Sequence, residues 1–173
     1  MGKKEITIFH LHMTSPAQHL RKVQPAELVI NEAKLKQAKV NRFLYQFIGE
    51  SWYWLDKLSW TDQQWIEYAE HENLRTWIAY TSGSIAGYYE LQLQDEETVE
   101  LKYFGLGPAS IGKGFGGAML SHAIDSAWRW GNETWGNTQR VWVNTCTLDH
   151  QHALTNYRSR GFTVFKEENV IDQ

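Results

Sequence analysis

Four glycines within six residues constrain this chain more than any other feature. They lie in the segment Gly112-Lys113-Gly114-Phe115-Gly116-Gly117. A helical pattern follows, because apolar residues fall on one stripe of residues 114–130. Backbone N–H groups of a glycine-rich turn at a helix N-terminus converge on anions, phosphate above all. The segment therefore predicts an anion-binding turn between a strand and a helix.

Two common phosphate-binding motifs fit this turn poorly. A dinucleotide fingerprint follows its strand at once, and a further strand and an acidic residue come about 20 residues later. Here residues 107–111 intervene, and the later segment is still helical in pattern. A nucleoside-triphosphate loop needs Ser or Thr after its lysine to hold magnesium, and Gly114 stands there. The sequence thus disfavours both motifs.

Strand and helix patterns along the chain predict a mixed α/β domain. The expected strands are 5–13, 27–30, 76–80, 85–93, 98–106, 139–145 and 162–165. Four helices are expected. Two cover residues 34–48 and 114–130, one runs from a cap at Thr61 or Asp62 to Ala69, and one runs from a cap at Asp149 to Arg160. Because no repeat or linker divides the chain, we predict one domain over residues 1–173.

Composition limits the cellular compartment and the kinds of partner that we expect for this chain. The single cysteine, Cys146, can form no internal disulfide, which fits a reducing compartment. No apolar run approaches about 18 residues, so we expect a cytoplasmic protein with no membrane partner. The net charge of −3 does not indicate nucleic-acid binding. No metal site is expected, since the pairs His10/His12 and His150/His152 lack a third ligand at suitable spacing.

Charge is distributed unevenly along the chain. Residues 50–100 carry eleven acidic side chains and two basic ones. Such a segment attracts cations, for example an amine, although a solvated acidic surface explains it equally well.

The glycine turn and its surroundings resemble the GNAT acetyltransferases. That family's pyrophosphate loop reads Arg/Gln-x-x-Gly-x-Gly/Ala, and the matching segment runs from Ile111 to Gly116. Leu106 and Pro108 match an apolar residue and a proline that precede the loop. Residues 151–162 are similar to a signature with Asn, Ala and Tyr that ends in Gly-Phe. The resemblance covers about residues 75–165 and departs from the pattern at Ile111 and Gln151, where Arg or Gln and Asn are usual.

The resemblance implies a fold, a reaction and a set of site residues. It implies a mostly antiparallel sheet, flanked by helices, whose strands 98–106 and 139–145 splay apart. It implies an N-acetyltransferase that moves an acetyl group from acetyl-CoA to a small-molecule or peptide amine. The expected cofactor-binding residues are Phe104, Leu106, Ile111, Gly112, Lys113, Gly114, Phe115, Gly116 and Gly117.

Three residues carry the chemistry that the resemblance implies. Glu100 is the candidate base, acting directly or through water, although an exposed strand carboxylate explains it as well. The Leu106 N–H is the oxyanion donor, and Tyr157 protonates the departing thiolate. The pair Cys146 and His150 is disfavoured as a nucleophilic dyad, because direct transfer needs no acyl-enzyme.

The acceptor side is expected in about residues 1–75, and the acyl-CoA core in about 76–165. Trp52 and Trp54, with Asn144, are the candidate acceptor residues; Trp60 belongs to the same aromatic segment, whose rings could hold an ammonium or simply pack. The alternative is a non-catalytic module that binds acyl-CoA or a protein partner. Oligomeric state stays open, with a homodimer as one option.

Overall fold

The computed structural model describes residues 4–95, 97–130 and 137–171. Its strands are β1 (Glu5–Met13), β2 (Val29–Glu32), β3 (Leu74–Thr81), β4 (Ser84–Leu93), β5 (Thr98–Leu106), β6 (Arg140–Cys146) and β7 (Thr163–Ile171). Its α-helices are α1 (Ala38–Gly49), α2 (Asp62–Ala69), α3 (Phe115–Trp128) and α4 (Ala153–Ser159). The mixed α/β class predicted from the sequence is confirmed.

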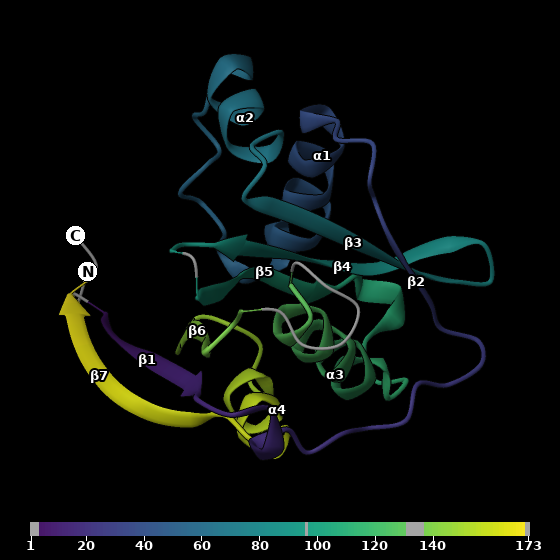
Figure 1. Ribbon diagram of the computed structural model, residues 1–173. Coiled ribbons are helices and arrows are strands. Elements are labelled where there is room, and N and C mark those ends of the chain that lie inside the picture. Colours follow the sequence, from purple (N-terminus) through teal and green to yellow (C-terminus); the bar gives the residue numbers. More distant parts are fainter. Residues whose placement is uncertain (1–3, 96, 131–136, 172–173) are drawn as a thin grey trace.

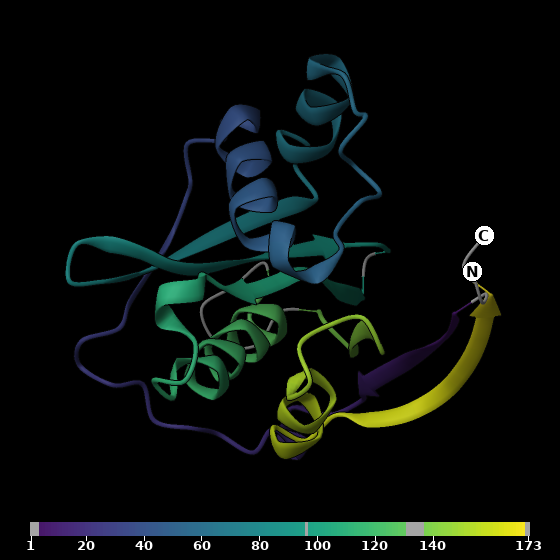
Figure 2. The same ribbon diagram turned by 180° about the vertical axis from the view of Figure 1, so that it is seen from behind.

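The described strands form one sheet in the order β2-β3-β4-β5-β6-β1-β7. β5 and β6 run parallel, and the other neighbouring strands are antiparallel. Helices α1 and α2 cover one face, while α3 and α4 cover the other (Figures 1 and 2). Met119, Leu120 and Ile124 of α3 are buried in the larger core, and Tyr45 and Trp65 fix α1 and α2 together in a smaller one. Each helix thus buries its apolar face against the sheet.

The two parallel strands stay together over only part of their length. Their pairing ends where Leu101 faces Val143. Beyond that point β5 follows β4 to Leu106, whereas β6 follows β1 to Cys146. The expected splay is confirmed, and it opens the sheet beside the glycine turn.

The first strand lies between the last two. β1 pairs with β6 on one side and with β7 on the other, and β1 and β7 curve away from the body of the molecule together (Figure 1). The chain then crosses below α4 and α3 on its way to β2, in residues 14–28, which we call the N-terminal strap (Figures 1 and 2). Leu20 N–H donates to the Arg160 carbonyl at 2.9 Å. Gly161 has φ +108°, and a Cβ there would lie 1.9 Å from the Gln18 carbonyl oxygen, so the strap seats against a position that requires glycine.

Helix α1 begins at Ala38, later than the residue 34 that the pattern predicts. The Ala33 N–H donates to the Thr76 carbonyl at 2.8 Å, which prolongs the pairing of this segment with β3. The Lys36 ammonium donates to the Leu74 carbonyl at 2.7 Å. These contacts hold residues 33–37 along β3 and delay the helix.

The predicted cap at Asp149 is wrong, whereas the cap at Thr61 is confirmed. The Asp149 carboxylate accepts hydrogen bonds from the Thr145 hydroxyl at 2.6 Å and the Cys146 N–H at 3.0 Å. It therefore closes the turn after β6, and α4 begins later, at Ala153, without a side-chain cap.

Among the strands, β2 and β7 also differ from their predicted ranges for identifiable reasons. β2 covers 29–32 rather than 27–30, because the Leu28 N–H closes a turn onto the Pro25 carbonyl at 3.1 Å. β7 extends to Ile171, since it pairs with β1 as far as Glu5.

Candidate active site

A cavity of about 1000 Å³ occupies the gap between β5 and β6. Its walls come from the end of β5, the first turn of α3, the end of β6, α4 and the aromatic segment 52–56. Most of the candidate site residues line it: Trp52, Trp54, Phe104, Leu106, Ile111, Gly112, Gly114, Phe115, Gly116, Gly117, Asn144 and Tyr157. Glu100 and Lys113 are the two candidates that do not. Residues distant in the sequence thus meet in one space large enough for a small-molecule ligand.

The glycine turn presents unused donors to this cavity. Gly112 and Gly114 have φ +82° and +79°, a backbone conformation that glycine favours, and a Cβ on either would face open space. α3 starts at the buried Phe115, and its N-cap residue, Gly114, supplies no side-chain acceptor. Within the described residues, the N–H groups of the first turn therefore have no side-chain capping partner. This cradle fits a pyrophosphate such as that of coenzyme A.

The Leu106 N–H is directed into the gap. The next residue, Gly107, donates its N–H to the Ala86 carbonyl of β4 at 2.8 Å. Successive residues of a strand direct their N–H groups to opposite edges, so the Leu106 N–H is directed away from β4. On that side β6 has diverged, which leaves this donor available to a ligand in the cavity.

Tyr157 has a fixed ring and a hydroxyl without a protein partner. The ring packs against Phe104 and Phe162, with centroids 6.2 and 5.9 Å away. The residue is 6% exposed and lines the cavity, and within the described part of the chain its hydroxyl forms no hydrogen bond. Burial raises the pKa of the phenol above its ordinary value. The hydroxyl therefore stays protonated at neutral pH and can act as a donor.

Glu100 is buried beside the cavity rather than on its wall. Its carboxylate accepts a hydrogen bond from the Gln94 side chain, which is held in turn by the Trp142 indole N–H at 2.8 Å. The Lys102 ammonium lies 3.7 Å away. Burial raises the pKa of Glu100, although Lys102 opposes the shift. A carboxylate in this state accepts a proton more readily than an exposed one.

The aromatic segment forms the far wall of the cavity. The Trp52 ring meets the His150 ring edge-on, with centroids 4.9 Å apart. Trp54 packs against Tyr103 at 4.9 Å. Trp60 does not line the cavity; its ring packs against Trp65 and Tyr68, and the Lys57 ammonium lies 4.5 Å from its centroid. Trp52 and Trp54 are thus the two indoles of the segment that a ligand can reach.

The cavity also exposes a carboxylate that the sequence did not single out. Asp56 accepts hydrogen bonds from the Tyr103 hydroxyl at 2.7 Å, the Tyr45 hydroxyl at 3.0 Å and the Lys57 ammonium at 2.8 Å. Burial alone would raise the pKa of Asp56, but the hydrogen bonds from Lys57 and Tyr103 outweigh it and hold that pKa below its ordinary value. The carboxylate is therefore ionised. The sequence could have suggested Asp56 only because it is an acidic residue within the aromatic segment.

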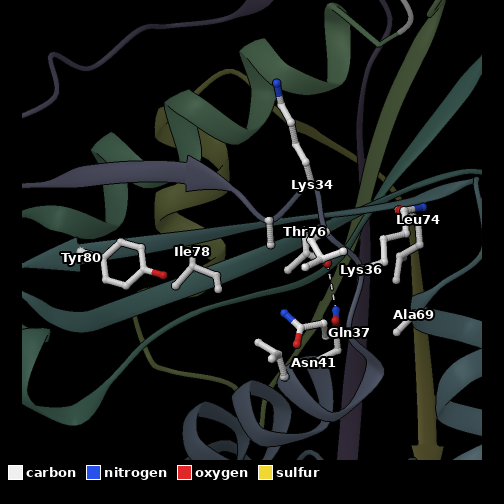
Figure 3. A pocket seen from close by; sticks show the side chains of 12 residues that line it. Lys34, Lys36, Gln37, Asn41, Ala69, Leu74, Thr76, Ile78 and Tyr80 are labelled. Carbon is white, nitrogen blue, oxygen red and sulfur yellow. Dashed lines mark hydrogen bonds between the residues drawn. The ribbon is translucent and has the colours of Figure 1, made fainter.

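A second cavity, of about 390 Å³, lies between α1 and β3 (Figure 3). Asn41 on its wall donates to the Thr76 hydroxyl at 2.8 Å and to the Glu90 carboxylate at 2.9 Å. Lys36 donates to backbone carbonyls, as described above. Because these polar groups already have partners within the protein, they stabilise the α1–sheet contact.

Two features are absent from the described ranges 4–95, 97–130 and 137–171. No helix there has the length and apolar character needed to cross a membrane. No three His, Cys, Asp or Glu side chains are grouped there so as to hold a metal ion.

Solved structures share this fold at low sequence identity. A GCN5-related N-acetyltransferase from Sphaerobacter thermophilus is 16% identical with a TM-score of 0.70, over 98% of this chain and 52% of its own. A GCN5-related N-acetyltransferase from Kribbella flavida is 15% identical with a TM-score of 0.66, over 96% and 60%. An aminoglycoside acetyltransferase from an uncultured soil sample is 18% identical with a TM-score of 0.58, over 85% and 94%. The chain spans about half the length of the first of these proteins.

Sequence comparison gives the family. No curated protein sequence matches the chain. The model of the acetyltransferase (GNAT) family matches residues 41–162, a range that contains β5, the glycine turn, α3 and α4. This match covers more than half of the chain and includes most of the cavity wall described above, so the chain belongs to the GNAT family of acetyltransferases.

Proposed function

We propose that this protein transfers an acetyl group from acetyl-CoA to a primary amine by direct attack in a ternary complex. One observation carries the proposal: the glycine turn, the Leu106 N–H and the Tyr157 hydroxyl all face a single cavity. Acyl transfer from a thioester needs a site for the carrier, a donor for the developing oxyanion and an acid for the leaving thiolate. The cavity offers a group for each.

The cofactor end is assigned to β5 and α3. Acetyl-CoA supplies the activated acetyl group. The N–H groups of the first turn of α3 bind its pyrophosphate, and the Leu106 N–H donates to the carbonyl oxygen of the thioester. As negative charge develops on that oxygen, this hydrogen bond strengthens, which lowers the barrier.

Two residues handle the protons. Tyr157 donates to the departing sulfur, since its raised pKa keeps it protonated. Glu100 takes the proton of the incoming ammonium. Because Glu100 does not line the cavity, we infer that this transfer runs through water. The raised pKa of Glu100 suits it to the task.

The acceptor end is assigned to the aromatic segment. The ionised Asp56, with Trp52, Trp54 and Asn144, surrounds the space left for an amine. A carboxylate and indole faces attract an ammonium by charge and by cation–π contact. These residues support a cationic small molecule or peptide as the acceptor.

The test is a screen of amines with the purified protein and acetyl-CoA. The panel contains polyamines, aminoglycosides, amino acids and peptides with a free N-terminus or lysine. We expect amine-dependent release of free thiol, and mass spectrometry should find the acetylated amine. Calorimetry with CoA separates two negative outcomes. If the protein binds CoA but acetylates no amine, it is a non-catalytic acyl-CoA-binding module. If it does not bind CoA, the proposed cofactor site is wrong.

A further inference from the structure

Two cationic side chains from distant parts of the chain meet at the glycine turn. Lys22 lies on the N-terminal strap, and Arg160 follows α4. The Lys22 ammonium lies 3.4 Å from the Gly114 carbonyl oxygen. A Cβ on Gly117 would lie 3.2 Å from the Lys22 ammonium and 3.1 Å from an Arg160 guanidinium nitrogen. Both charges therefore flank the same side of the first turn of α3.

The strap holds Lys22 in this place through its backbone. The Lys22 N–H donates to the Ser121 hydroxyl at 3.1 Å, one helical turn along α3 from Gly117. The preceding residue, Arg21, is fixed by Asp125 at 2.5 Å. On the other side, the Leu20 N–H donates to the Arg160 carbonyl at 2.9 Å. The strap thus joins α3 to the end of α4 at the point where the two cations meet.

Neither cation has a charged partner among the described residues. In the described part of the chain, Lys22 and Arg160 form no ion pair with a carboxylate, in contrast to the neighbouring Arg21. The Arg160 Nε is buried and has no hydrogen-bond partner among the described residues. Like charges held together repel, and a buried unpaired donor destabilises the fold. An anion bound at this position would reduce the repulsion between the two cations and accept a hydrogen bond from the unpaired donor.

The cavity indicates which anion this is. Gly114, Gly117 and Ser159 line it and lie next to the two cations in the chain or in space, so Lys22 and Arg160 stand at its edge rather than on its wall. Ile111, which also lines the cavity, offers the cofactor no charge. We propose that Lys22 of the N-terminal strap and Arg160 after α4 bind a phosphate group of acyl-CoA and supply the charge that Ile111 lacks. This inference rests on the proposed acetyl-CoA site.

The test measures CoA binding by calorimetry in Lys22→Gln and Arg160→Gln. Lys39→Gln and Arg42→Gln serve as controls, since they remove the same charges from α1, which covers the opposite face of the sheet from α3 and α4 (Figure 1). We expect each site variant to bind CoA about ten- to a hundredfold more weakly, as for loss of a charge-assisted hydrogen bond. The controls should bind like the wild type. The rise in thermal midpoint on adding CoA should shrink only in the site variants.

Repeating the titrations with 3′-dephospho-CoA identifies the phosphate. If the cations bind the 3′-phosphate, the variants lose affinity for CoA but not for dephospho-CoA. If they bind the pyrophosphate, both ligands lose affinity equally. Site variants that bind both ligands like the controls would overturn this inference and leave the proposed function intact. A wild-type protein that does not bind CoA would overturn both, whereas tight binding without acetyl transfer would overturn only the function.

Discussion

At the scale of single residues, the phenol of Tyr157 can be tested separately from its ring. The ring is packed by Phe104 and Phe162, whereas the hydroxyl has no partner in the described structure. Tyr157→Phe keeps the packing and removes the donor. We expect kcat to fall about 10²- to 10⁴-fold, the usual range for a general acid, while CoA affinity and thermal midpoint stay close to wild type. A kcat near the wild-type value would mean that Tyr157 only packs and that water protonates the thiolate.

Gly114 offers a second test with a matched control in the same protein. Gly114 and Gly83 both have positive φ, +79° and +76°, and a Cβ on either faces open space. Gly114→Val and Gly83→Val should therefore destabilise the fold similarly, by about 1–2 kcal/mol of left-handed strain. Only Gly114→Val should also weaken acetyl-CoA binding sharply, because its side chain would fill the phosphate cradle. If calorimetry finds equal acetyl-CoA affinities for the two variants, the phosphate does not bind at this turn.

Site residues differ in how far they could be predicted. Leu106 and the glycine turn lie within one continuous strand, turn and helix, so their relative positions follow from local geometry. Asp56 reaches the cavity, and Lys22 and Arg160 reach the glycine turn, only through tertiary contacts with β5, α3 and the strap. Charge patterning marked the acidic segment but could not choose Asp56 within it. A single sequence contains no short-range signal for such placements.

At the scale of elements, one buried carboxylate joins the sheet to both helices of its face. Glu90 on β4 is 1% exposed and accepts hydrogen bonds from Asn41 of α1 at 2.9 Å and from Tyr68 of α2 at 2.5 Å. Burial raises the pKa of Glu90, although these hydrogen bonds oppose the shift. The folded state therefore holds this proton more tightly than the unfolded state. Its contribution to stability is complete below the ordinary pKa of 4.5 and is lost as pH rises through the raised value.

Glu90→Gln removes that titration. We expect the free energy of unfolding to fall less between about pH 5 and about pH 8 in this variant than in the wild type, as measured by urea denaturation at each pH. Glu72→Gln, which removes an exposed carboxylate, is the control for the lost charge. An unchanged pH dependence in Glu90→Gln would show that the buried carboxylate does not govern the stability of this face.

Element boundaries differ from the predicted ones where competing hydrogen bonds hold a residue outside the expected element. The pattern of residues 34–37 is helical, but the contacts of Ala33 and Lys36 with β3 hold this segment extended. Asp149 has a side chain suited to capping a helix, but its carboxylate accepts hydrogen bonds from the Thr145 hydroxyl and the Cys146 N–H instead. Thr61 was predictable because its partner, Gln64, lies in the same turn. A capping pattern predicts the helix start when no competing hydrogen bond already holds the capping side chain.

At the scale of the whole molecule, charge should steer the acceptor. The acidic segment 50–100 contributes Asp56 to the cavity, and the net charge is −3. For a cationic acceptor we expect kcat/KM to fall several-fold as ionic strength rises past about 0.1 M, where screening acts within about 10 Å. Asp56→Asn should lower kcat/KM and flatten this salt dependence. Asp62→Asn, which removes a charge outside the cavity wall, should leave it unchanged. A best acceptor that is neutral or anionic would contradict the assignment.

The position of β1 between β6 and β7 has a consequence for biosynthesis. β1 leaves the ribosome before either partner exists, and 140 positions separate Thr7 from Thr147, which hydrogen-bond in the finished protein. At about 5–20 residues per second, both edges of the first strand stay unpaired for about 7 to 30 seconds, exposed to chaperones and to other nascent chains. Such distant pairing also makes folding slow, because a long loop must close before the contacts form. The opening between β5 and β6 gains its outer support from β1 only after synthesis of the last strands, so the binding site matures late.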